Sequence, residues 1–189
     1  MESYALLIAA TLNAGTVLAL AALGLLINEK AGVVNLGAEG MMLCAAIAGF
    51  ACVVHTGNDW LGFAAGMGAG ALLAAIFGVL VIWLNTNQYA TGLALSLFGV
   101  GFSAFVGIGY VQEKLPERPN YEIPFLADIP LLGPAFFKQH PLVYAAILLA
   151  LALIWFLYKS RTGLVLRAVG ESPASALSLI HISEPTRPY

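Results

Sequence analysis

The sequence predicts an all-α integral membrane protein, a polytopic helical bundle with about five spans. The composition points to this class first: 60% of the 189 residues are hydrophobic and 10% are charged, whereas soluble domains carry about 25% charged residues. The second observation is a series of apolar runs, each long enough to cross a hydrocarbon core of about 30 Å. The third is that short polar links separate these runs. Too few polar side chains remain to cover a surface that faces water.

Five apolar runs account for most of the chain. The first has 24 residues without a charge, which as a helix extends over about 36 Å. In the third run Gly62, Gly66 and Gly70 recur every four residues, a pattern of small residues that brings membrane helices together. We interpret that pattern as helix packing. The five runs are residues 4–27, 32–54, 60–84, 89–110 and 141–158.

Basic residues set the expected orientation. Lys159, Arg161 and Arg167 follow the fifth run within nine positions, and such clusters mark the cytoplasmic side of a membrane. Counting back places the proline-rich loop 111–140 outside and the N-terminus outside. Residues 1–3 hold no basic n-region, so we expect no cleaved signal peptide. Residues 159–176 are then cytoplasmic.

One acidic residue stands inside an apolar run. Within the five runs Glu39 is the only residue among the types Asp, Glu, Lys, Arg and His, and an acid at a helix centre costs about 2.5–3.5 kcal/mol on insertion scales. Asn35 lies four positions earlier, so on a helix the two would share a face. We predict that Asn35 and Glu39 line or shape a path through the bundle, or hold a helix break at its entrance. The alternative is that Glu39 bonds neighbouring backbone amides and fixes the bundle.

Polar residues also gather at the inner end of the fourth run. Gln88 and Thr91, with Asn87 before them, could form an inner gate of the same path. They could instead be caps of the helix at the membrane interface, and this is the interpretation we favour. No metal-binding or catalytic residue is predicted.

Three segments carry a family resemblance. Residues 29–43 read EKAGVVNLGAEGMML, residues 87–93 read NQYATGL, and residues 162–173 read TGLVLRAVGESP. They resemble, in family order, the permease subunits of bacterial ABC importers, the inner membrane components of binding-protein-dependent transport systems. The resemblance is to the branch that serves nucleosides and simple sugars. It covers the chain to about Ala176.

The resemblance implies a mechanism and partners. Two permease subunits, the same or different, would form the pathway in the cytoplasmic (inner) membrane and work by alternating access. Two ATPase subunits and an extracytoplasmic binding protein would complete the importer. ATP would be bound by the ATPase, so this subunit would be non-catalytic and carry no cofactor; the sequence holds no G-x-x-x-x-G-K-[ST] loop. The loop after Arg161 would be a short helix seated in the ATPase. Its coupling residues would be Leu166, Arg167, Gly170, Glu171 and Pro173.

Three other functions stay open. One is an amino-acid-type ABC permease of the same superfamily. A second is a passive channel, which would not need the segment LRAVGE. A third is an intramembrane enzyme that uses Glu39 as an acid or base. Such chemistry would want a second acid or base at membrane depth, and the other runs hold no Asp, Glu, Lys, Arg or His.

The end of the chain has a different character. Residues 177–187 read LSLIHISEPTR, which resembles the in-frame translation of a sequencing adapter. We therefore expect residues 1–176 to be the N-terminal part of a longer permease's transmembrane domain. Residues 177–189 would be an artefactual tail.

Overall fold

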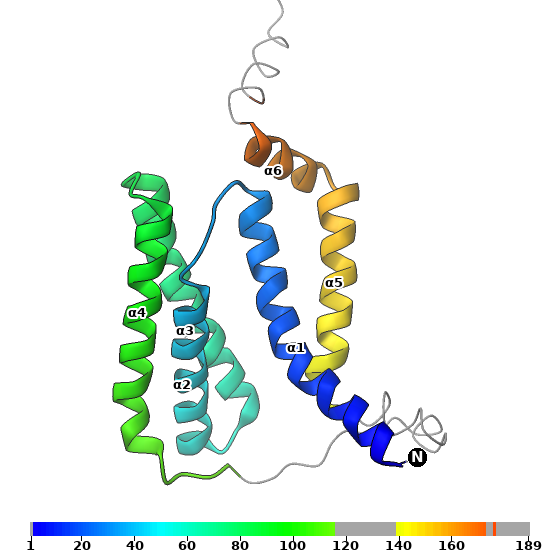
Figure 1. Cartoon of the computed structure of the whole chain (residues 1–189), viewed down its shortest axis with the longest axis vertical. Helices are drawn as coiled ribbons and strands as arrows, with labels where there is room; N and C mark the ends of the chain where they lie inside the picture. The colour runs from blue at the N-terminus through cyan, green and yellow to red at the C-terminus, as the bar shows by residue number, and fades with distance from the viewer. Residues whose placement is uncertain (1, 116–138, 173–175, 177–189) are drawn as a thin grey trace, which may run out of the picture. The chain divides into compact units, whose positions relative to one another are not determined.

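The computed structural model describes residues 2–115, 139–172 and 176, with side chains from residue 6 onward. The chain forms two compact units, one of residues Met1–Val33 and Arg118–Tyr189, the other of residues Val34–Glu117. Helices α1, α5 and α6 belong to the first unit, and α2, α3 and α4 to the second (Figure 1). Each unit is described by itself below.

Among the described residues, five helices are long and apolar enough to cross a membrane. This confirms the predicted all-α, multi-pass fold with about five spans. Large apolar side chains such as Trp83 and Phe105 are exposed along these helices, as expected where lipid rather than water is the solvent. The candidate spans are Leu6–Lys30, Ala38–Thr56, Asp59–Trp83, Gln88–Tyr110 and Pro141–Lys159.

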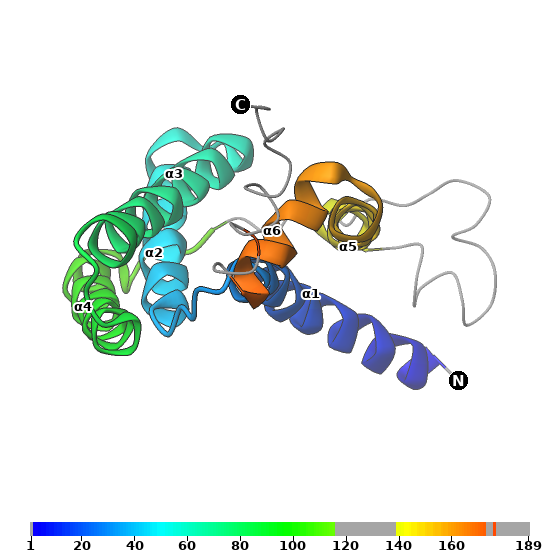
Figure 2. The same cartoon turned by 90° about the horizontal axis from the view of Figure 1, so that it is seen from above.

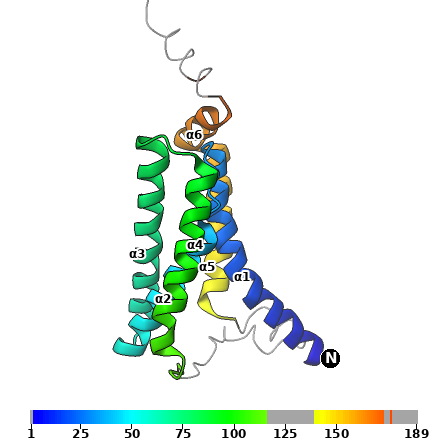
Figure 3. The ribbon, with the colours of Figure 1, turned by 60° about the vertical axis from the view of Figure 1, so that its left-hand side comes forward.

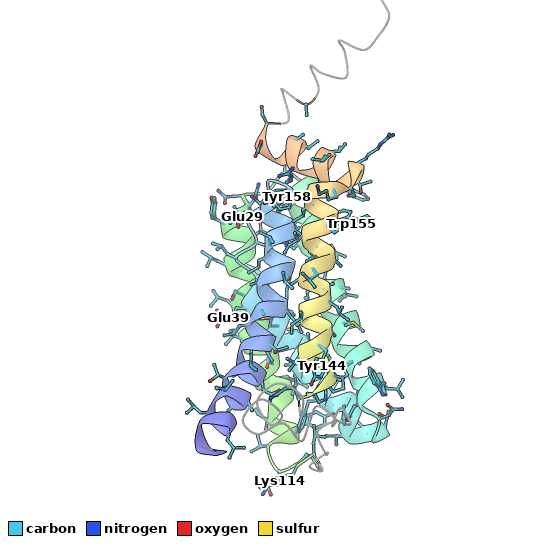
Figure 4. All side chains as sticks on the ribbon, turned by 90° about the vertical axis from the view of Figure 1, so that its right-hand side faces the viewer. Glu29, Glu39, Lys114, Tyr144, Trp155 and Tyr158 are labelled. Carbon is cyan, nitrogen blue, oxygen red and sulfur yellow. The ribbon has the colours of Figure 1, made fainter. Side chains whose placement is uncertain are left out.

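In the first unit, α1 (Glu2–Lys30) packs along α5 (Pro141–Lys159), and α6 (Arg161–Glu171) crosses the ends of both (Figures 1 and 4). The amide of Asn13 donates to Oε1 of Gln139, which is fully buried, over 2.8 Å. A turn at Ser160 separates α5 from α6. Its hydroxyl donates to the carbonyl of residue 156 and accepts from the amide of residue 163.

In the second unit, α2 (Ala38–Thr56) packs against both α3 (Asp59–Gly78) and α4 (Gln88–Gly107) (Figures 2 and 3). The α2–α3 contact confirms the packing interpretation of the glycines in the third run. A Cβ atom on Gly66 would lie 3.0 Å from the carbonyl oxygen of Ala45, and one on Gly62 would lie 3.0 Å from that of Gly49. Small residues thus let the two backbones approach closely.

Short irregular turns end α3 and α4. A π-helical turn, Val79–Trp83, follows α3, and a 3₁₀ turn, Ile108–Tyr110, follows α4. Asn85 adopts a positive φ of 50° in the link between the two helices. At the other end of the unit, Tyr110 Oη lies 3.0 Å from Nε2 of His55, so a hydrogen bond joins the 3₁₀ turn after α4 to the last turn of α2.

The second span begins later than the sequence predicted. The apolar run starts near Gly32, but α2 begins only at Ala38, and α1 instead continues through Lys30. Gly32 has φ of 82°, a left-handed conformation that ends the helix before it. Further on, Oδ1 of Asn35 accepts from the amide of Gly37 over 3.0 Å. This local turn competes with helix formation and delays α2.

Several predictions fall outside the described residues. They concern most of the proline-rich loop, namely residues 116–138, together with Pro173 and the tail 177–189.

Candidate functional site

The segment between α1 and α2 lies across the first turn of α4. A Cβ atom on Gly92 would stand 2.9 Å from the amide nitrogen of Leu36 and 3.0 Å from that of Gly37. Oε1 of Gln88 accepts from the amide of Val34 over 2.8 Å. Backbone amides outside helices need such partners at membrane depth, where water is scarce. Gln88 therefore fastens the segment to the start of α4.

Asn35 stabilises the same segment from within. Its side chain is buried; besides the bond to Gly37, its amide lies 3.6 Å from Sδ of Met41. Because α2 starts at Ala38, Asn35 precedes the helix, and the prediction that it shares a helix face with Glu39 was wrong. The role that its geometry fits is that of holding the break.

Glu39 points away from the packed side of α2. It is exposed in the first helical turn, on the same side as Met42 and Ala46, which are also exposed. The N-cap residue Gly37 offers no side-chain acceptor to the first amides of the helix. A carboxylate near such unpaired amides is favoured by the helix dipole. Glu39 thus lies at a helix start, on a face that neither α3 nor α4 covers.

A backbone contact between α2 and α4 fixes this orientation. A Cβ atom on Gly40 would lie 2.6 Å from the carbonyl oxygen of Leu95 and 2.6 Å from Cα of Ser96, and one on Gly99 would overlap the backbone of Gly40. Since two backbones touch, α2 cannot rotate without separating from α4. The contact directs the side chain of the preceding residue, Glu39, to the open side. Gly99 was not predicted from the sequence, and the spacing of small residues in the fourth run was the signal that could have found it.

The other polar residues at the start of α4 form hydrogen bonds within the unit. Oδ1 of Asn87 accepts from the amides of Tyr89 and Ala90 over 3.0 and 3.2 Å, so the interpretation of Asn87 as a cap is confirmed. Oγ1 of Thr91 lies 2.9 Å from that of Thr86, which donates to the carbonyl of residue 80. These bonds tie the α3–α4 link to the first turn of α4.

The coupling candidates in α6 divide between two sides of that helix. Gly170 packs against the backbone at the end of α1, and Gly163 against that at the end of α5. Cζ of Arg167 stands 4.5 Å from the centre of the Tyr158 ring, a cation–π contact with the last turn of α5. These three positions, spaced four and three apart, form one inward face.

The opposite side of α6 is apolar and exposed. Leu164, Val165 and Val169 lie there, and Val165 is 62% exposed. Of the predicted coupling residues, Glu171 is exposed at the helix end, while Leu166 is half-buried. The inward face of α6 is thus occupied by contacts with α1 and α5, and the opposite face exposes apolar side chains. An exposed apolar face of this kind suits docking against another protein.

The described residues thus form a multi-pass helical membrane protein with a non-helical segment before its second span and a short helix across the ends of two spans. The chain belongs to the family described as "Branched-chain amino acid transport system / permease component", whose pattern residues 7–179 match.

Two relatives that are named as ABC transporter permease proteins agree with this class. The chain is 47% identical over 181 residues to the "Putative glucose ABC transporter permease protein TsgC13" of Haloferax volcanii, covering 93% of this chain and 55% of that protein. It is 37% identical over 192 residues to the "Guanosine ABC transporter permease protein NupQ" of Bacillus subtilis, covering 93% of this chain and 59% of the relative. The chain therefore spans little more than half the length of these relatives. No solved structure matches it significantly.

Proposed function

We propose that this chain is the N-terminal, membrane-spanning part of an ABC-importer permease that takes up nucleosides or simple sugars by alternating access. The match of residues 7–179 to the permease family carries this proposal. The relatives' names, which specify glucose and guanosine, favour a sugar or nucleoside over an amino acid. The membrane is the bacterial cytoplasmic membrane, with the N-terminus outside and residues 159–176 in the cytoplasm.

The pathway runs along the open face of α2 that begins at Glu39. Its exposure supports this assignment, because an acid at membrane depth is expensive against lipid and normally faces a water-filled cavity or another protein. Asn35, Gln88 and Thr91, whose hydrogen bonds lie inside the unit, shape the entrance rather than touch the solute. A second permease subunit, the same or different, closes the other side of the path.

The ATPase docks on the exposed apolar side of α6, at Leu164, Val165 and Val169. ATP is bound and hydrolysed by that partner, so the permease is not itself an enzyme and holds no cofactor. Arg167 and Gly170 face α5 and α1, so their part in coupling is to position α6. Glu171, exposed at the end of the helix, is available to the partner. A binding protein delivers the solute from outside.

Uptake assays test the pathway. The full-length permease, reconstituted in liposomes with its ATPase and binding protein, should take up labelled guanosine or glucose only with ATP. Glu39→Ala should abolish uptake while the complex stays assembled. The matched control is Glu113→Ala, which removes an exposed carboxylate beyond the end of α4, outside the proposed path. Uptake without ATP would identify a passive channel. Normal uptake by Glu39→Ala, or loss of the protein itself, would contradict the pathway role.

Co-purification tests the docking surface. Val165→Glu should release the ATPase, because it places a charge in an apolar interface. The control is Val111→Glu, since Val111 is 80% exposed beyond the end of α4 and lies outside the proposed surface. Undiminished ATPase recovery with Val165→Glu would refute this surface. A wild-type permease that never retains an ATPase would refute the importer function altogether.

A further inference from the structure

Helix α6 is attached to two helices through backbone-to-backbone contacts. A Cβ atom on Gly163 would lie 2.8 Å from Cα of Leu157 in α5, and one on Gly170 would lie 2.8 Å from the amide nitrogen of Gly32. A Cβ atom on Gly32 would in turn lie 3.0 Å from the carbonyl oxygen of Gly170. No side chain stands between the partners in these contacts, so no rotamer change can relieve an added methyl group.

The two attachments are unequal in kind. Only Ser160 separates α6 from α5, and its hydroxyl caps α6 at the amide of Gly163. This connection is covalent and short. The connection to α1 is not covalent near α6 and relies on the Gly170–Gly32 contact, seven residues or about 10 Å further along the helix. The contacts described at Ser160, Gly163 and Arg167 all hold α6 to α5, so the contact of Gly170 is what joins α6 to the end of α1.

We propose that the Gly170–Gly32 contact is a mechanical joint that makes α6 and the end of α1 one rigid lever. Movement that the ATPase imposes on α6 is then passed to α1 as well as to α5. The inference rests on the proposed function, and it assigns Gly32 and Gly170 as positioning residues that touch neither solute nor ATPase. Close-packed backbones transmit displacement in this way because protein interiors have low compressibility.

The test is the amount of solute moved per ATP hydrolysed by the assembled full-length complex. Gly170→Ala should keep the ATPase bound and hydrolysing but lose most of the uptake, because the added methyl group pushes α6 off the end of α1. The control is Gly24→Ala, since a Cβ atom there meets nothing within 4 Å. In this variant the amount of solute moved per ATP hydrolysed should equal that of the wild type. Unchanged coupling in Gly170→Ala would overturn the joint while leaving the proposed function intact.

A distance measurement covers the case in which Gly170→Ala does not fold. Spin labels on Glu29→Cys and Thr162→Cys, both exposed, report the separation of α1 and α6 once Cys44 and Cys52 are replaced by alanine. The separation should be the same with and without ATP. A change in this label-to-label distance on ATP binding would refute the proposal that α6 and the end of α1 move as one rigid body. Failure of the wild-type complex to bind an ATPase would refute the proposed function and the lever with it.

Discussion

The contact between Gly40 and Gly99 makes a quantitative prediction about how α2 and α4 hold together. In Gly99→Ala the new methyl group would overlap the backbone of Gly40, whereas in Gly101→Ala, two residues further along the same helix, it meets nothing within 4 Å. The two variants add the same atoms to the same helix. They differ only in whether α2 stands in the way.

The size of the effect follows from the distances. A Cβ atom on Gly40 would lie 2.6 Å from Leu95 O, whereas ordinary contact begins at 3.4 Å. An added methyl group at this contact therefore drives the helices apart by roughly 1 Å, a gap that forfeits a quarter to a half of the dispersion energy of the contacts it opens. Overpacking of this kind costs about 1–3 kcal/mol. The gain in helix propensity from glycine to alanine, about 1 kcal/mol, is common to both variants and cancels.

Thermal unfolding of the purified chain in lipid nanodiscs measures the difference. With about 2–4 °C of melting temperature per kcal/mol for a chain of this size, Gly99→Ala should melt about 2–12 °C below Gly101→Ala. Circular dichroism at 25 °C should show both variants helical. Equal melting temperatures would refute the backbone contact, and with it the argument that this contact fixes the direction of Glu39.

Two hydrogen bonds, Asn13–Gln139 and Val34–Gln88, can also be tested. A double-mutant cycle with Asn13→Leu and Gln139→Leu should give a coupling free energy of about 0.6–1.7 kcal/mol, the range for polar pairs between membrane helices; strictly additive losses of stability would contradict the bond. Gln88→Leu leaves the amide of Val34 without this acceptor and should cost about 0.5–1.5 kcal/mol in unfolding free energy, the net contribution of a typical hydrogen bond. Gln88→Glu keeps an acceptor oxygen and should cost less, so equal losses would show that the bond is not what Gln88 contributes.

Sequence reasoning predicted the spans well because their signal is simple. A run of about 20 apolar residues is forced into a helix in lipid, since its backbone has no other partner. The glycines of α3 were interpreted correctly for a related reason: spacing by four places them on one face, and such a face invites close approach. The short helix after Arg161 was expected from the resemblance of LRAVGE, and α6 is helical there.

The start of α2 was predicted wrongly because hydrophobicity does not distinguish a helix from a chain break. Residues 33–37 are as apolar as the helix that follows. What delays the helix is the turn closed by the Asn35 side chain and the bond from Val34 to Gln88, 54 positions away. Hydrophobic periodicity holds no information about a partner so distant in sequence.

The two sides of α6 could not be separated from the sequence either. The motif drew attention to Arg167 and Gly170 equally with Leu166 and Glu171. Which of them face the permease's own helices depends on the angle at which α6 leaves α5, and that angle is set by the hydroxyl of Ser160 and the close approach at Gly163. Those are contacts of a folded chain.

The bond between Asn13 and Gln139 has a consequence for biosynthesis. The two residues are 126 positions apart, and at about 5–20 residues per second the ribosome needs about 6–25 s to pass from one to the other. During that interval the first helix holds the Asn13 carboxamide in the bilayer before Gln139, its hydrogen-bond partner, has been synthesised. We therefore expect the first helix to stay beside the insertion machinery until Gln139 is made. A product that ends before Gln139 would leave the Asn13 amide without this partner, a feature that membrane quality control can recognise.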